Sequence, residues 1–136
     1  MWTANVNDFV FKIRIYYEDT DSAGVVYHAN YVKFLERART EWLRALGVDQ
    51  KTLLDEAGIQ FVVRQFSLRL RQPARYDDEL SVVCRIAQLH PFRMRFAQQI
   101  WCGTLLVDAE VEVVCVNKVT FKPVTIPEWV QQLLKD

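Results

Sequence analysis

The sequence lacks a long apolar run, and it carries no excess of charge of either sign. No hydrophobic stretch approaches the roughly 18 residues needed to span a bilayer, so we expect no transmembrane segment. Lysine plus arginine equals aspartate plus glutamate, at 17 each. This balance argues against a dedicated nucleic-acid binder, which should show a basic excess. The first residues also lack a positive and apolar leader, so no secretory signal is expected.

Cysteine and histidine are also scarce. The three cysteines are Cys84, Cys102 and Cys115. Their odd number and wide spacing exclude a disulfide framework and favour reduced thiols in a cytoplasmic protein. Two distant histidines and scattered cysteines also make no recognisable metal site, so no metal is expected.

The chain contains no internal repeat, low-complexity tract or linker, and its 136 residues fit one domain covering 1–136. Apolar residues alternate with polar ones in five segments, which predicts strands with one buried face. These segments lie near 9–15, 65–72, 80–86, 92–101 and 105–115.

Between the first two strand segments the apolar period changes from two to that of a helix. Tyr31, Phe34, Leu35, Ala38 and Trp42 fall on one stripe, which predicts a long helix over 30–46. Gly47 is placed to end this helix. Pro127 begins a short apolar stripe that predicts a terminal helix.

The order of these segments predicts an α+β fold. We expect a five-stranded antiparallel sheet curled around one long central helix, with the last four strands forming a meander and a short helix at the C-terminus. One helix cannot cover both faces of such a sheet, and open strand edges remain. We therefore expect a homo-oligomer formed through edge pairing or face packing.

The densest chemistry lies between the first strand and the long helix. Asp19, Asp21 and Gly24 superficially match a calcium loop, but its fifth position is Ala23 and its twelfth is Asn30, so two ligand oxygens are missing. An aspartate-based phosphatase signature fits no better, because the preceding strand alternates and no βαβ series follows. A simple turn that caps the helix is a third interpretation.

The position of these acids beside a helix start favours a reactive site. Backbone N–H groups at the first turn of a helix are unpaired, and the helix dipole is positive there. A carboxylate near such donors can attack a carbonyl, or activate water to attack it, while the N–H groups receive the carbonyl oxygen. No cofactor is required for this chemistry.

Residues 17–39 (YEDTDSAGVVYHANYVKFLERAR) resemble the signature of the hotdog-fold acyl-CoA thioesterases of the 4-hydroxybenzoyl-CoA thioesterase type. More narrowly, they are similar to the branch called tol-pal system-associated acyl-CoA thioesterases. Residues 61–64 (FVVR), 73–78 (PARYDD) and 109–115 (AEVEVVC) resemble that branch too. The resemblance extends from about Phe9 to Pro127.

The resemblance implies a hotdog fold, with dimers that join their sheets edge to edge and often pair into homotetramers. It implies that Asp21 is the catalytic carboxylate and that Tyr17 and His28 are site residues. It also implies that the oxyanion-binding N–H lies near His28. We expect Asp21 to be partly buried near Tyr17, and Asp19 to support the turn.

The implied substrate is an acyl-CoA, which is hydrolysed to a carboxylic acid and coenzyme A. Coenzyme A carries phosphates, for which Arg93, Arg95 and Lys118 are the candidate ligands. Arg64 and Lys122 are further candidates. His90, which precedes a proline in a turn, is interpreted as structural.

Two other functions stay open from the sequence. One is a binding or scaffolding module that works with cell-envelope or lipid-synthesis proteins, in which hydrolysis is secondary. The other is a hotdog dehydratase or hydratase, although those enzymes usually show a different pattern. The acyl preference and the choice between direct attack and water activation by Asp21 are not readable from the sequence.

Overall fold

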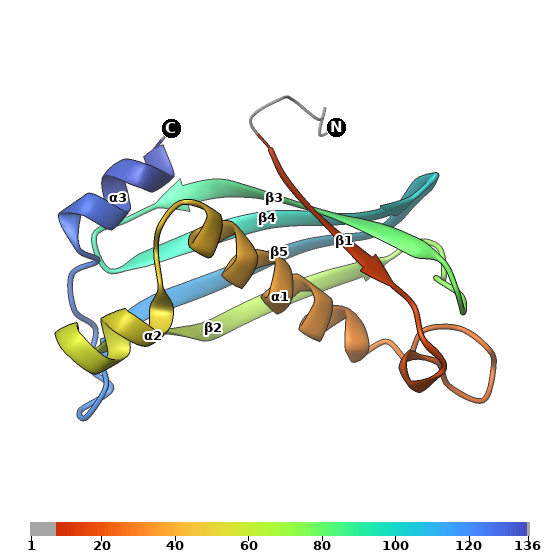
Figure 1. The fold of residues 1–136 in the computed structure, drawn as a ribbon, viewed down its shortest axis with the longest axis horizontal. Helices are drawn as coiled ribbons and strands as arrows, with labels where there is room; N and C mark the ends of the chain where they lie inside the picture. The colour runs from red at the N-terminus through yellow and green to blue at the C-terminus, as the bar shows by residue number, and fades with distance from the viewer. Residues whose placement is uncertain (1–7, 136) are drawn as a thin grey trace.

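The computed structural model describes residues 8–135. It contains five strands, two α-helices of at least two turns, and short helical segments (Figure 1). In chain order the elements are β1 (Phe9–Arg14), the 3-10 turn η1 (Tyr17–Asp19), α1 (Asn30–Ala45), α2 (Gln50–Thr52), the π-helical turn η2 (Leu53–Ala57), β2 (Ile59–Leu70), β3 (Glu79–Leu89), β4 (Arg93–Cys102), β5 (Thr104–Asn117) and α3 (Glu128–Lys135). The predicted α+β class and element order are confirmed, but α2 and η2 were not predicted.

The strands form one antiparallel sheet in the order β1-β3-β4-β5-β2. Only β3, β4 and β5 form a meander, so the prediction that β2 belongs to it is wrong. The physical reason is the connection 71–78, which is too long for a tight hairpin. It runs beside the loop after β1, where the backbone N–H of Val26 donates to the oxygen of Ala74 at 2.8 Å. The strand β2 therefore pairs with β5 at the opposite edge from β1.

The helix α1 lies across the inner face of this sheet and packs mainly against β3 and β1. Phe34, Leu35 and Ala38 are fully buried beneath it. Gly47 ends the helix as predicted, with a φ of +94°. The backbone N–H of Val48 donates to the oxygen of Leu43 at 2.8 Å, and that of Gly47 to Arg44 at 3.0 Å. These two bonds form a Schellman motif, which fixes the helix end.

The edge strand β2 departs furthest from its predicted pattern. It begins at Ile59 rather than near residue 65, and its register with β5 shifts between Val63 and Gln65. Beyond this bulge Phe66 and Leu70 stay largely exposed, as does Val63 before it. An edge strand with exposed apolar side chains is a surface suited to pairing with another chain.

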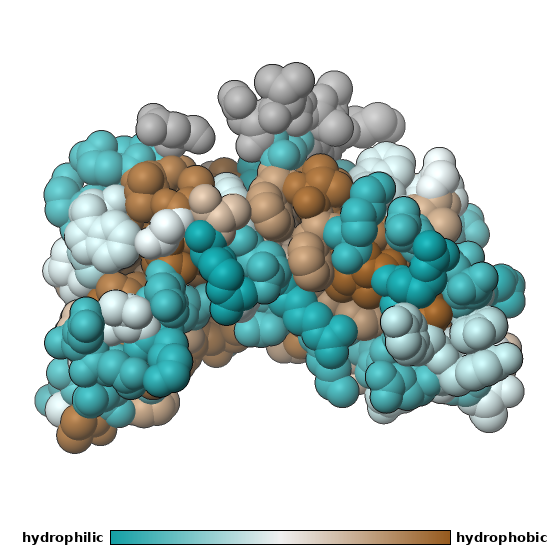
Figure 2. Space-filling view, in the orientation of Figure 1, coloured by the Kyte–Doolittle hydropathy of each residue, from teal (hydrophilic) through white to brown (hydrophobic). Residues whose placement is uncertain are grey.

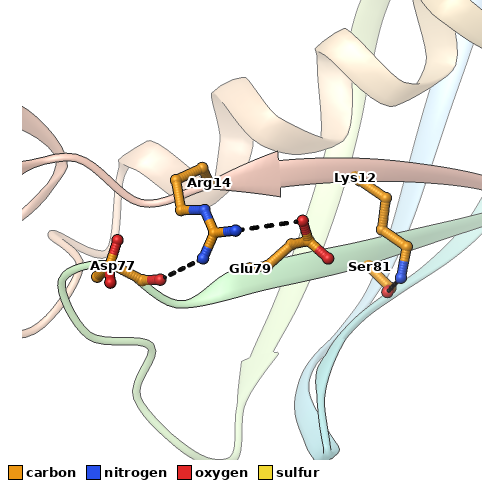
Figure 3. A network of polar contacts seen from close by, with 5 residues as sticks. All are labelled: Lys12, Arg14, Asp77, Glu79 and Ser81. Carbon is orange, nitrogen blue, oxygen red and sulfur yellow. Dashed lines mark hydrogen bonds and ion pairs between the residues drawn. The ribbon is translucent and has the colours of Figure 1, made fainter.

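A network of polar contacts joins β1 to the start of β3 (Figure 3). The Arg14 guanidinium donates to the backbone oxygen of Asp77 at 2.7 Å and pairs with Glu79 at 3.4 Å, while Lys12 donates to Ser81 at 2.7 Å. These groups are exposed, so each contributes little free energy on its own. Together they hold the turn at 75–78 against the end of β1.

One polar pair lies deep between α1 and the sheet. Arg39 is only 7% exposed, and its guanidinium donates to the side-chain oxygen of Gln98 at 3.0 Å. The Gln98 amide donates in turn to the backbone oxygen of Leu35 at 3.0 Å and to Sγ of Cys84 at 3.1 Å. Burial lowers the pKa of Arg39 and raises the pKa of Cys84 to about 12. No carboxylate within residues 8–135 forms an ion pair with Arg39.

Replacing Gln98 by leucine removes this acceptor and leaves the buried Arg39 charge uncompensated. We expect Gln98→Leu to lower the free energy of unfolding by about 3 kcal/mol, the scale for breaking a buried charge contact. Urea denaturation measures the change. The double variant Arg39→Met/Gln98→Leu removes the charge as well and is expected to recover most of the loss. A double variant as unstable as the single one would show that lost packing is the cause.

Candidate active site

The loop between β1 and α1 is tied to the helix start by Asp19. One carboxylate oxygen of Asp19 accepts the backbone N–H of Tyr16 at 2.9 Å, and the other accepts the side-chain amide of Asn30 at 3.1 Å. Its backbone oxygen accepts the N–H of Tyr27 at 2.9 Å. These bonds match the supporting role expected for Asp19.

The turn that follows presents Asp21. The backbone N–H of Asp21 donates to Val25 at 2.9 Å, and the N–H of Gly24 donates back to Asp21 at 3.0 Å. Gly24 has a φ of +80°, which favours glycine at this position. One Asp21 oxygen, Oδ1, accepts the N–H of Ala23 at 2.8 Å. The other, Oδ2, has no hydrogen-bond partner within residues 8–135, so it is available for reaction.

Asp21 and His28 line the same cleft, as their position in the sequence predicts. The cleft has a volume of about 290 Å³. Its walls come from the loop, the start of α1 and the chain that leaves β2, and its lining residues are Asp21, Val25, Val26, His28, Tyr31, Leu70, Arg71, Gln72 and Pro73. Asp21 is exposed in the single chain, so the expected partial burial against Tyr17 is not observed.

Unpaired backbone donors lie at the helix start beside this cleft. The N–H groups of Asn30, Tyr31 and Val32 donate to backbone oxygens three residues earlier, at 2.8, 3.3 and 3.2 Å. In the part of the chain that the structure describes, the N–H groups of His28 and Ala29 have no acceptor. They stand at the positive end of the α1 dipole, which makes them suitable donors to a developing oxyanion.

Tyr31 joins the helix start to the opposite wall, a contact that the sequence did not reveal. Its hydroxyl accepts the backbone N–H of Ala74 at 3.1 Å, and burial raises the pKa of Tyr31. The sequence shows Tyr31 only as the first member of an apolar helix stripe. Its partner lies 43 residues away, so spacing alone gives no signal for the bond.

Tyr17 lies outside the lining of the cleft. Its ring stacks on Tyr76, with centroids 3.9 Å apart and planes at 3°. Both rings are exposed, and the adjacent Tyr17 phenol raises the pKa of Tyr76. Tyr76 follows Arg75, whose backbone bridges to Val25, whereas Tyr17 belongs to η1.

The predicted phosphate ligands lie at the other end of the sheet. Arg93, Arg95 and Arg64 surround Glu112, at 3.6, 3.7 and 3.6 Å. Lys118 donates its backbone N–H to Gly58 at 2.9 Å at the same end. Arg93 is opposite Val114 of β5, whereas Leu70 beside the cleft is opposite Val107. Seven strand residues separate these positions by about 23 Å, so the fold of one chain does not bring the two groups together.

His90 lies in the turn between β3 and β4. Its ring nitrogen is 3.4 Å from the side-chain oxygen of Gln88, and its backbone N–H donates to Arg93 at 2.8 Å. These contacts agree with its structural interpretation. Residues 8–135 hold no group of three or more His, Cys, Asp or Glu side chains placed to bind a metal ion. Among the described helices none is long and apolar enough to cross a membrane.

A sheet that curls around one long helix, with a carboxylate and free N–H groups at the helix start, defines a hotdog-fold protein with a candidate carbonyl-binding cleft. The family model described as the thioesterase-like superfamily matches residues 16–134. The chain belongs to this superfamily, which confirms the family and the hotdog fold expected from the sequence.

More particular relatives are also similar to the chain. It is 43% identical to an acyl-CoA thioesterase, YbgC, from Haemophilus influenzae, over 92% of this chain and 93% of that protein. A probable thioesterase from Bartonella henselae is 37% identical, with a TM-score of 0.83 over 88% of this chain and 99% of the other. A 1,4-dihydroxy-2-naphthoyl-CoA thioesterase from Synechocystis, 24% identical over 96% of this chain and 97% of that one, shares the fold with a TM-score of 0.89.

Proposed function

We propose that this protein is an acyl-CoA thioesterase that hydrolyses an acyl-CoA to a carboxylic acid and coenzyme A. The observation that carries the proposal is that the free Asp21 oxygen and His28 share one cleft, beside the unpaired N–H groups of His28 and Ala29. The curated relatives named as acyl-CoA thioesterases support it.

In the proposed reaction the thioester carbonyl oxygen accepts the backbone N–H groups at the helix start. These donors stabilise the negative charge that develops as the carbonyl carbon becomes tetrahedral. Asp21 either attacks that carbon or removes a proton from an attacking water. The C–S bond then breaks and the sulfur leaves as the thiolate of coenzyme A. In the water route Asp21 passes the proton it took from water to this sulfur, and the acid forms directly. In the direct route the acyl group stays on Asp21 as an anhydride, and a water then hydrolyses it, which releases the acid, restores the carboxylate and supplies the proton for the thiolate. Thiolate leaves readily, so a carboxylate and an oxyanion site are sufficient.

His28 and Tyr17 are proposed as further site residues. His28 lines the cleft at the helix start, where it orients Asp21 or donates to the thioester oxygen. Tyr17 stacks on Tyr76 beside the same loop and forms an exposed aromatic surface next to the cleft. Both assignments come from the family motif, and of the two side chains only that of His28 lines the cleft.

A second copy of the chain is proposed to complete the site. The outer edge of β2 has no partner strand within residues 8–135, and Val63, Phe66 and Leu70 are exposed along it. Two copies related by a two-fold axis would pair their β2 edges antiparallel. This arrangement brings the start of one β2 next to the end of the other. Arg93, Arg95 and Lys118 of one copy would then lie toward the cleft of its partner and receive the phosphates of coenzyme A.

Other aspects remain proposals that rest on the family resemblance. These are a single thioesterase domain over 1–136, a cytoplasmic location, assembly of dimers into a homotetramer, and a tol-pal association with lipid-synthesis or envelope proteins. A scaffolding module with secondary hydrolysis is the alternative function.

Replacing Asp21 by asparagine keeps the shape of the turn but removes the carboxylate. We expect Asp21→Asn to lower kcat by at least about 100-fold, the scale for a catalytic acid–base group. Free thiol release measures the rate, and thermal melting checks the fold. Asp55→Asn, an exposed acid paired with Lys51 at the other end of the molecule, is the matched control. Near-normal hydrolysis by Asp21→Asn would contradict the assignment.

A panel of acyl-CoAs separates an enzyme from a scaffold. Short, long and aromatic acyl chains are each offered to the folded protein, and thiol release is followed. We expect at least one member to be hydrolysed with a steady turnover that Asp21→Asn abolishes. Absence of hydrolysis for every member, with the fold intact, would favour the scaffolding function.

Sharing of the site between copies can be tested with hybrids. Asp21→Asn and Arg93→Ser/Arg95→Ser are each expected to be poorly active, the second through a raised KM. When the two are refolded together, a hybrid dimer contains one site with both parts intact. We expect the mixture to recover activity above the sum of the separate variants. Unchanged activity in Arg93→Ser/Arg95→Ser would contradict the phosphate-binding role, and a mixture without recovery would contradict sharing across the interface.

A further inference from the structure

A turn after β5 presents hydrophobic side chains to solvent. Val119 is 80% exposed and Phe121 is 59% exposed. We call residues 118–122 the β5 tip. It projects from the end of β5 at the lower left of Figure 1, and Figure 2 shows hydrophobic surface at that end of the molecule. Neither side chain belongs to the hydrophobic core.

The backbone of the β5 tip is held in place by Asn117. Its side-chain oxygen accepts the N–H groups of Val119 at 2.8 Å and Thr120 at 3.1 Å. Its backbone accepts the N–H of Phe121 and donates to Lys122, both at 2.9 Å. The exposure of the two apolar side chains is therefore built into the turn.

Phe121 occupies a conformation that a bulky residue rarely adopts. Its φ is +58°, in the left-handed region that favours glycine or asparagine. Placing phenylalanine there costs free energy. Because the ring is exposed, its packing within the chain offsets little of that cost. A favourable environment outside the chain would account for this choice of residue.

The charges around the two apolar side chains are positive. Lys118 and Lys122 bracket them in the sequence, and within residues 8–135 neither lysine forms an ion pair. The acids on the adjacent η2 turn are Asp55, which pairs with Lys51 at 2.9 Å, and Glu56. The tip itself therefore combines an apolar end with two cations and no acid.

We propose that the β5 tip binds the surface of a bilayer that contains anionic lipids. Val119 and Phe121 enter the boundary between headgroups and acyl chains. The aliphatic parts of the Lys118 and Lys122 side chains lie alongside these two residues, and their ammonium groups lie among the lipid phosphates. A protein partner fits less well, because two side chains on a convex turn offer far less area than the roughly 1,000 Å² of a stable interface.

Within one copy of the chain this surface lies far from the candidate cleft. Lys118 follows the end of β5 that pairs with the start of β2, whereas the cleft adjoins Leu70 at the other end of that strand. Binding at the tip therefore leaves the Asp21 of the same copy accessible. The inference does not depend on the proposed thioesterase activity.

Vesicle flotation tests the proposal with the full chain. We expect wild-type protein to float with vesicles of phosphatidylglycerol and phosphatidylcholine, and less with phosphatidylcholine alone. Val119→Ser/Phe121→Asn should lower the partition coefficient about ten-fold or more, since it removes two apolar side chains from the lipid boundary. Lys118→Gln/Lys122→Gln should weaken binding to the anionic vesicles and reduce its salt dependence. Val10→Ser, which changes an exposed apolar residue on β1, should bind like wild type.

Two measurements keep the result interpretable. Asparagine is favoured at positive φ, so Val119→Ser/Phe121→Asn should melt no lower than wild type, and lost binding cannot then be ascribed to unfolding. Failure of the wild type to float with anionic vesicles would overturn the proposal. Equal flotation of all variants would also overturn it. A change in oligomer mass in the tip variant, without any vesicle binding, would show instead that the tip contacts another copy of the chain.

Discussion

The burial of one face of α1 against the sheet is the constraint on which the rest of the structure depends. Phe34, Leu35 and Ala38 are removed from water beneath β1 and β3, and each large apolar side chain buried in this way contributes about 2–3 kcal/mol. This packing fixes the axis of α1 and hence the position of its first turn. The cleft, the unpaired N–H groups and the loop carrying Asp21 all follow from where that turn lies.

The helix α1 covers the sheet unevenly, and this bears on the proposed assembly of two copies. Because α1 lies toward β1 and β3, the far edge of the sheet keeps apolar side chains on β2 without cover. The cleft borders the end of that strand at Leu70. The proposed assembly and the proposed active site therefore share one strand, which gives a physical basis for completing the site with a second copy.

The regular parts of the fold were predictable from periodicity, because α1 has the apolar period of a helix and ends at Gly47, and apolar residues alternate with polar ones along β5. The strand β2 was not, because its first half (IQFVV) does not alternate, and the bulge beside Arg64 shifts its register. That Asp21 and His28 line one cleft was predictable because both lie close in sequence to a helix start. The choice of Asp21 over Asp19 came from the family resemblance. The wall formed by Tyr31 and Ala74 depends on a contact between distant residues, which one sequence does not encode in its spacing.

The sheet order has a consequence for how the protein folds. Ile59 of β2 pairs with Asn117 of β5, 58 residues later, and contacts of such separation form slowly because a long loop must close first. The chain that leaves β2 supplies one wall of the cleft. The reactive loop and the helix start can form early, but they gain that wall only after the last strand is in place. A chain that has not finished folding therefore presents Asp21 without the wall that residues 70–73 add to its cleft.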